Sequence, residues 1–156
     1  MASHVYHEIF LHFNWHTKNN AALLRGRVEE EAHRQIQEKA CRVRGVSLLE
    51  LGGTDDHVHL ALRIAPSVTI SELVQELKGA SSHAVNEALG QKILEWQRGY
   101  GVVSFGRGHL DWVRRYIQQQ REHHAQGTAI ERLELCEEME GDVENPARAE
   151  ASEKPG

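Results

Sequence analysis

Apolar and polar positions follow two different periods along this chain. A period of two marks residues 5–17 and 57–62, where apolar and polar side chains alternate as on half-buried strands. Residues 46–51 are mainly aliphatic and predict another strand. Apolar positions recur at helical spacing in residues 27–44, and again in a segment for which Ser71 is a plausible N-cap. The pattern therefore predicts three strands and two helices in the first part of the chain.

The later part of the chain predicts one more strand and one clear helix. Residues 99–105 have the composition of a strand, and residues 93–97 are interpreted as a shorter strand or its lead-in. A helix is expected over residues 109–124, with Gly127 as its stop. A weaker helix is expected over residues 128–139.

The order of these elements is strand, helix, strand, strand, helix, strand, helix. The strands on either side of Gly52-Gly53-Thr54-Asp55 are joined so briefly that they should pair antiparallel. We predict an α+β fold, an antiparallel sheet with helices packed on it, of the ferredoxin-like split βαβ kind with an additional C-terminal helix. Residues 1–139 are expected to form the domain, and residues 140–156 an acidic, disordered tail.

The charge of the chain is unevenly distributed. Residues 131–156 hold 9 acidic and 3 basic residues, a net charge of -6, while the remaining residues hold 14 acidic and 15 basic ones. The body is therefore close to neutral, which permits nucleic-acid binding through a local basic patch. No apolar run is long enough to span a bilayer, and no signal peptide is recognisable. With only two distant cysteines, we expect a reduced, cytoplasmic protein without a membrane partner.

The first candidate functional motif is Asp56-His57-Val58-His59. On a strand, His57 and His59 share one face, so both imidazoles can reach one metal ion. The competing interpretation is a pair of histidines on the solvated face of a sheet.

A second candidate pair is Tyr116 and Gln120, which are four residues apart and share one face of a helix. The amide oxygen of Gln120 is a hard ligand suited to Mg²⁺ or Mn²⁺ beside imidazoles. Tyrosine is a nucleophile only when a cation or base stabilises its phenolate. The alternative is a half-buried aromatic residue beside a solvated glutamine.

The order and spacing of several fragments resemble the HUH single-tyrosine transposases, the insertion-sequence-200-like family that includes the transposases associated with repetitive extragenic palindromes. The resemblance extends over residues 6–124. Its fragments are Trp15-His16-Thr17-Lys18-Asn19, Asp56-His57-Val58-His59-Leu60, Leu77-Lys78-Gly79-Ala80-Ser81-Ser82, Gly99-Tyr100-Gly101-Val102-Val103-Ser104-Phe105 and Arg114-Arg115-Tyr116-Ile117-Gln118-Gln119-Gln120.

The resemblance implies a metal-dependent enzyme that acts on single-stranded DNA next to hairpins. His57, His59 and Gln120 would bind a divalent metal, Mg²⁺ or Mn²⁺, and Tyr116 would attack the DNA to form a 5′-phosphotyrosine. Many members of this family are homodimers in which the tyrosine helix of one subunit completes the site of the other, and some relatives are monomers. The resemblance therefore favours a homodimer with shared sites and leaves the monomer as the alternative.

Five basic residues are candidates for phosphate contacts, and the alternative for each is an ordinary surface cation. They are Lys18, Lys78, Arg107, Arg114 and Arg115. The three tryptophans, Trp15, Trp96 and Trp112, are interpreted as core residues, and His123 and His124 as exposed.

Two other functions stay open at this point. One is a domesticated protein that binds DNA hairpins without cutting them. The other is a zinc-dependent hydrolase that uses His57 and His59, with Asp55 or Asp56 as a further ligand.

Overall fold

The computed structural model describes residues 4–136, so the expected domain end at residue 139 and the expected tail lie outside the described residues. Four strands form the sheet: β1 (Ile9–His16), β2 (Val46–Gly53), β3 (His57–Ile64) and β4 (Gly101–Phe105). The helices are α1 (Gly26–Arg42), α2 (Ile70–Leu89), α3 (Leu110–Gln118), α4 (Gln120–Gln126) and α5 (Glu131–Glu134), with short 3-10 turns η1 (Lys18–Asn20) and η2 (Arg107–His109).

The sheet has the strand order β2-β3-β1-β4, and every neighbouring pair is antiparallel. Strand β3 lies between β1 and β2, so the chain crosses over it through α1, as the ferredoxin-like arrangement requires. The predicted fold class is confirmed. The predicted antiparallel pairing of β2 with β3 is confirmed as well, with a bulge between Leu48 and Glu50.

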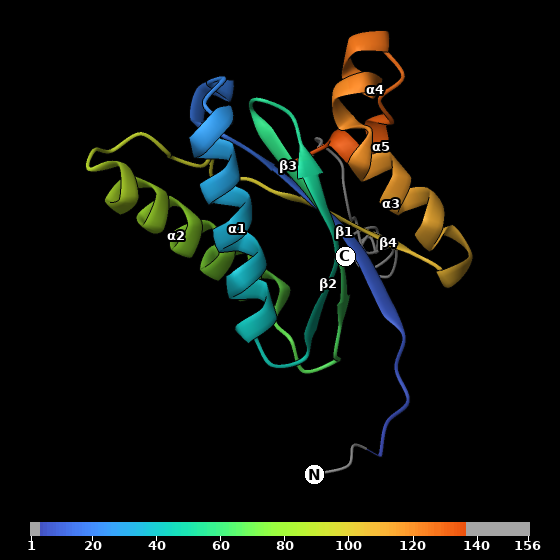
Figure 1. The fold of residues 1–156 in the computed structure, drawn as a ribbon. Helices are drawn as coiled ribbons and strands as arrows, with labels where there is room; N and C mark the ends of the chain where they lie inside the picture. Colours follow the sequence, from blue (N-terminus) through green and yellow to red (C-terminus); the bar gives the residue numbers. More distant parts are fainter. Residues whose placement is uncertain (1–3, 137–156) are drawn as a thin grey trace, which may run out of the picture.

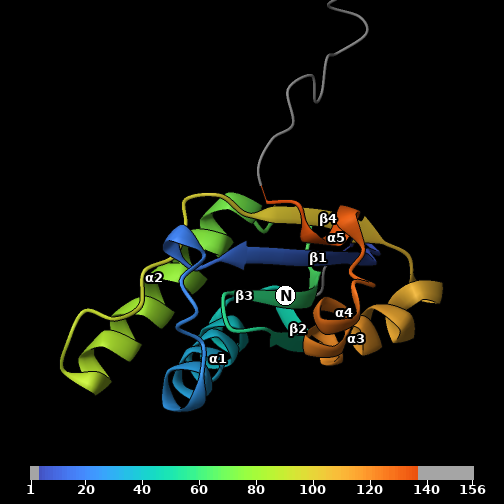
Figure 2. The ribbon, with the colours of Figure 1, turned by 90° about the horizontal axis from the view of Figure 1, so that it is seen from above.

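Helices cover both faces of the sheet. Figures 1 and 2 show α1 and α2 side by side on one face, and α3, α4 and α5 on the other. The main core lies under α1 and α2, where Phe13, Trp15, Leu60 and Leu62 are buried. A smaller apolar cluster of Ala61, Val113 and Ile117 holds α3 on the second face.

The second face of the two central strands is polar. Because side chains alternate along a strand, most apolar residues of β1 and β3 face α1 and α2, while their polar residues, together with Ala61, face α3 to α5. These polar residues are buried although they are histidines and an asparagine: His12, Asn14, His57 and His59. Buried polar groups need partners, and the partners of these residues define the candidate site.

Several element boundaries differ from the predicted ones. The first strand begins at Ile9 rather than at residue 5, and residues 93–97 form only a single bridge, between Thr17 and Trp96. Ser71 lies inside α2, whose N-cap residue is Thr69. The helix predicted over residues 128–139 is the four-residue α5 within the part that the structure describes.

The helix predicted over residues 109–124 is divided. The backbone leaves helical geometry at Gln119, where φ is -106° and ψ is 23°, so α3 ends and α4 begins there. Gly127 ends α4 in the left-handed conformation, as predicted. Among the described residues, no helix combines the length and the apolar character that crossing a bilayer would require.

Gly52 brings α3 close to the sheet, which yields a test of the packing. A Cβ at residue 52 would lie 2.5 Å from the carbonyl oxygen of Ile117, whereas a Cβ at Gly79, inside α2, would meet nothing within 4 Å. We expect Gly52→Ala to lower the free energy of unfolding by about 1–3 kcal/mol. Gly79→Ala should raise it by roughly 0.5–1 kcal/mol, because alanine favours the helix.

Urea unfolding of the two variants beside the wild type measures both effects. Equal stability of Gly52→Ala and wild type would contradict the close approach of α3 to β2.

Candidate active site

His57 is held by residues at the start of β3. Its Nδ1 atom lies 2.7 Å from Oδ1 of Asp56 and 2.8 Å from Oγ1 of Thr54. A carboxylate accepts hydrogen bonds, so a proton belongs on Nδ1, and in the neutral ring Nε2 carries the lone pair. Burial opposes the charged form of His57, but the Glu134 and Asp56 carboxylates outweigh it and raise the pKa of His57, so a proton and a cation compete for Nε2. This is the carboxylate–histidine arrangement that orients many metal ligands in proteins.

His59 is held by a residue of β1. Its Nδ1 atom lies 2.8 Å from Nε2 of His12, and both rings are fully buried. When His59 donates this bond, its Nε2 atom is left with a lone pair, on the side where Nε2 of His57 lies. Burial lowers the pKa of His59 to about 4 and that of His12 to about 3, which keeps both rings neutral near pH 7. Neutral imidazole is the form that binds metals.

The break at Gln119 brings Gln120 to these histidines. Gln120 is 1% exposed, and its Nε2 atom donates a 3.1 Å hydrogen bond to the carbonyl oxygen of Tyr116. That contact turns Oε1 inward, 3.4 Å from Nε2 of His57. The structure thus brings together His57, His59 and Gln120.

Tyr116 lies at the edge of the same cluster. Its ring centroid is 6.0 Å from that of His59, and Trp112 stacks on its outer side at 5.5 Å. The hydroxyl donates a 2.5 Å hydrogen bond to Oε1 of Glu134 and accepts one from the Ile130 amide. Burial and the Glu134 carboxylate raise the pKa of Tyr116 to about 12. In this arrangement the tyrosine is a neutral phenol.

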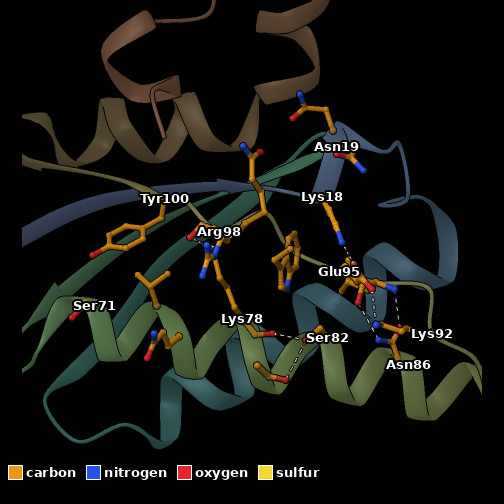
Figure 3. Close-up of a pocket in the computed structure, with 17 residues that line it drawn as sticks. Lys18, Asn19, Ser71, Lys78, Ser82, Asn86, Lys92, Glu95, Arg98 and Tyr100 are labelled. Carbon is orange, nitrogen blue, oxygen red and sulfur yellow. Dashed lines mark hydrogen bonds and ion pairs between the residues drawn. The ribbon is translucent and has the colours of Figure 1, made fainter. Parts of the chain in front are cut away.

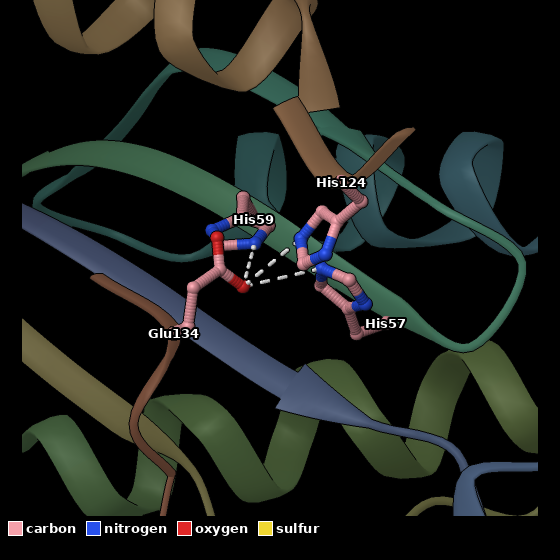
Figure 4. Close-up of side chains that lie close together, drawn as sticks. All are labelled: His57, His59, His124 and Glu134. Atoms are coloured by element: carbon pink, nitrogen blue, oxygen red, sulfur yellow. Dashed lines mark hydrogen bonds and ion pairs between the residues drawn. The ribbon is translucent and has the colours of Figure 1, made fainter. Parts of the chain in front are cut away.

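Two residues of the cluster, Glu134 and His124, are not among the predicted site residues, although His124 is exposed as predicted. Figure 4 shows the carboxylate of Glu134 in α5 pointing at three imidazoles, with Oε2 3.4 Å from Nε2 of His57, 3.2 Å from that of His59 and 3.3 Å from that of His124. No motif marks Glu134, which lies in the weaker helix predicted over residues 128–139. The only sequence signal for His124 is its position four residues after Gln120, on the same face of α4.

The spacing of these atoms fits one cation. Adjacent ligands that are each about 2.0–2.2 Å from an ion lie about 3–3.6 Å from one another. The ligand atoms of His57, His59, His124 and Glu134 all lie within 4.8 Å of one another, and the three separations to Oε2 of Glu134, at 3.2–3.4 Å, fall in that range, as ion pairs do as well. Imidazole nitrogens with carboxylate and amide oxygens are a donor set for a divalent metal such as Mn²⁺ or Zn²⁺.

Neither aspartate before His57 joins this cluster. Asp56 bonds the far nitrogen of His57, and Asp55 forms ion pairs with Arg25 and Arg121. The carboxylate of the cluster is instead that of Glu134.

Two of the five predicted phosphate contacts, Lys18 and Lys78, line a groove of about 1060 Å³ together with Arg98 and Tyr100 (Figure 3). Nζ of Lys78 donates to the backbone carbonyls of residues 97, 98 and 99. Lys18 is paired with Glu95. A phosphate would therefore replace an existing partner at either lysine.

The other three predicted phosphate contacts lie outside that groove. Arg107 is paired with Glu8 and Arg114 with Glu50, while Arg115 is exposed without an ion pair among the described residues. The prediction of phosphate contacts stays a prediction for all five.

The tryptophans divide into two groups. Trp15 is buried and Trp96 meets it edge-on, which confirms their assignment to the core. Trp112 is 44% exposed, so its assignment to the core is wrong. Its stacking on Tyr116 explains its position at the site.

Comparison with known proteins identifies relatives of the chain. The sequence model of the family described as IS200-like transposases matches residues 5–120. The transposases for insertion sequence element IS200 from Salmonella typhimurium (strain LT2) and Salmonella typhi are each 32% identical over 101 residues, or 61% of this chain. The match spans 66% of each of these relatives, just under two thirds of their length.

Two solved structures share the fold. One is a candidate transposase from Deinococcus radiodurans R1, with a TM-score of 0.61 and 24% identity, covering 77% of this chain and 96% of that one. The other is a REP-associated tyrosine transposase bound to a REP hairpin, with a TM-score of 0.56 and 16% identity, covering 83% of this chain and 76% of that one. At these identities the likeness establishes the fold.

The contact between Asp56 and His57 predicts a difference between two neighbouring aspartates. Asp56→Asn removes the carboxylate that fixes the His57 tautomer, and we expect the affinity for Mn²⁺ to fall about 10–100-fold. Asp55→Asn is the matched control, since Asp55 is paired with arginines and touches no ligand atom. Isothermal titration with Mn²⁺ measures both. An equal loss of Mn²⁺ affinity in the two variants would show that the carboxylate acts through its charge and does not act by orienting His57.

Proposed function

The chain belongs to the IS200-like transposase family, and from this premise we propose that it is a metal-dependent enzyme that cuts and rejoins single-stranded DNA beside hairpins. The observation that carries the proposal is the convergence of Tyr116 with His57, His59 and Gln120 at one buried site. A nucleophile beside a candidate cation site is what phosphoryl transfer requires.

Tyr116 is the proposed nucleophile. Its phenol oxygen attacks the scissile phosphorus, the bond from phosphorus to the 3′ oxygen breaks, and a 5′-phosphotyrosine forms with a free 3′-hydroxyl. The phenol gives up its proton in this step, and the leaving oxygen takes one up. A 3′-hydroxyl can later attack the phosphotyrosine, so that strand joining conserves the energy of the broken bond.

His57, His59 and Gln120 are the proposed ligands of Mg²⁺ or Mn²⁺. The bound cation would polarise the scissile phosphate and stabilise charge on the attacking and leaving oxygens. The contribution of the chain is orientation, because Asp56 and His12 fix the two imidazoles before metal or DNA arrives. Removal of the metal by a chelator should abolish cleavage.

Hairpin DNA is the proposed substrate. One solved structure with this fold is described as bound to a REP hairpin, which supports a hairpin ligand here. The groove lined by Lys18 and Lys78 is a suitable place for phosphates, because it adjoins aromatic and amide side chains as well as cations.

A homodimer with shared active sites is proposed from the family resemblance and from Gly106-Arg107-Gly108, which precedes α3. Within the single chain described, Tyr116 already lies at its own histidines. Sharing of sites therefore means that α3 leaves this position and docks on the partner.

Replacement of Tyr116 by phenylalanine separates chemistry from binding. Tyr116→Phe keeps the ring, so we expect DNA binding to persist and cleavage to vanish. Wild type with a single-stranded hairpin from the flanks of its gene and Mn²⁺ should give a covalent adduct that survives denaturing electrophoresis and maps to Tyr116. An adduct on Tyr6 or Tyr100 would overturn the assignment. Tight binding without any cleavage by wild type would indicate a domesticated hairpin-binding protein.

Complementation tests the sharing of sites. Inactive His57→Ala mixed with inactive Tyr116→Phe should regain part of the wild-type cleavage rate if the tyrosine of one subunit serves the histidines of the other. Each variant alone is the control. Wild type that is monomeric by light scattering and active at high dilution would contradict shared sites and leave the proposed chemistry in place.

A further inference from the structure

The segment of residues 130–135 closes the candidate site. It follows residues 5–120, the part that the family model matches, and it ends over the histidines. Tyr116 is only 2% exposed, and both partners of its hydroxyl, Ile130 and Glu134, come from this segment. A DNA phosphate cannot reach the hydroxyl while the segment is in this place.

The sheet holds this segment through specific contacts. The buried side chain of Asn14 donates from Nδ2 to the carbonyl oxygens of Leu133 and Leu135, at 2.9 and 3.0 Å. Leu133 is itself buried, and Arg132 donates to the Ser104 carbonyl of β4. Asn14 is a buried polar residue, and both of these side-chain hydrogen bonds run to residues 130–135. The docked position of residues 130–135 is therefore built into the sheet.

Glu134 occupies the centre of the cluster. One carboxylate oxygen faces three imidazole nitrogens at ligand spacing, and the other accepts a hydrogen bond from the Tyr116 hydroxyl. We propose that Glu134, together with His124, ligates the cation beside His57 and His59, and that this ligation closes the resting site until the segment is displaced.

The expected consequence of the closed state, slower cleavage, rests on the proposed function. The assignment of Glu134 as a metal ligand rests on the geometry of the cluster alone. A carboxylate is the only negatively charged ligand in this set, so its loss should weaken cation binding more than loss of a neutral group. Loss of the same carboxylate should make the proposed nucleophile more accessible, because it removes the hydrogen bond that holds the Tyr116 hydroxyl.

The test compares Glu134→Gln with Glu131→Gln. Glutamine keeps the shape of the side chain, and Glu131 is the exposed glutamate of the same helix, outside the cluster. Titration with Mn²⁺ should show affinity about tenfold or more weaker for Glu134→Gln, and unchanged affinity for Glu131→Gln.

Nitration of Tyr116 by tetranitromethane, in protein loaded with Mn²⁺, should be faster in Glu134→Gln, with Tyr6 at 83% exposure as the internal reference. Adduct formation at saturating Mn²⁺ should be faster as well.

A second variant moves the segment without touching a ligand. A Cβ at Gly101 would lie 1.9 Å from the carbonyl oxygen of Leu135, so Gly101→Ala should displace the segment. Faster nitration of Tyr116 is expected in this variant too, with the circular dichroism spectrum as the check on folding.

The outcomes separate this proposal from the proposed function. Unchanged Mn²⁺ affinity in Glu134→Gln would overturn Glu134 as a ligand. Slower adduct formation without faster nitration would overturn the closed state and give Glu134 a role in the reaction itself. If no protein forms an adduct on any hairpin, the proposed function fails, while Mn²⁺ affinity and nitration still decide on Glu134.

Discussion

Two imidazoles buried at the centre of a sheet impose a constraint on everything around them. His57 and His59 are at most 2% exposed, and a buried polar ring is stable only when its nitrogens have partners. Asp56 and His12 supply the partners of the Nδ1 atoms, which leaves both Nε2 atoms facing the same small space. The helices of the second face then bring polar groups to that space. This face of the sheet therefore carries the candidate metal site, while the α1 and α2 face provides the core.

The division between α3 and α4 is the second determinant of the site. A continuous helix would place Tyr116 and Gln120 on one face, but the irregular backbone at Gln119 lets Gln120 turn its amide back to the Tyr116 carbonyl. The same break carries His124 over the histidines, where its Nε2 atom lies 3.2 Å from Oε1 of Gln120. Irregular turns inside helices are frequent at functional sites. Here the break allows one short segment to supply the proposed nucleophile and two candidate ligands.

Periodicity predicted most of the fold because its signals are local. Alternation in β1 and β3 and the apolar stripe of α2 are properties of a few neighbouring residues, and the element order then limits the topology. Periodicity also placed His57 beside His59, and Tyr116 near Gln120. It could not find Glu134, because that contact depends on how Asn14 and Gly101 receive a segment far away in sequence. Nor could it place Trp112, because this residue is exposed and stacks on Tyr116, which was predicted as a nucleophile and not as a packing partner.

The central claim of this account is that the polar face of the sheet binds one divalent cation through His57 and His59. Anomalous diffraction from crystals grown with Mn²⁺ tests it most directly, because the signal locates the ion itself. We expect one strong peak per chain within bonding distance of both Nε2 atoms, and its loss in His59→Ala. A peak elsewhere in the structure, or none in crystals of active protein, would contradict the claim.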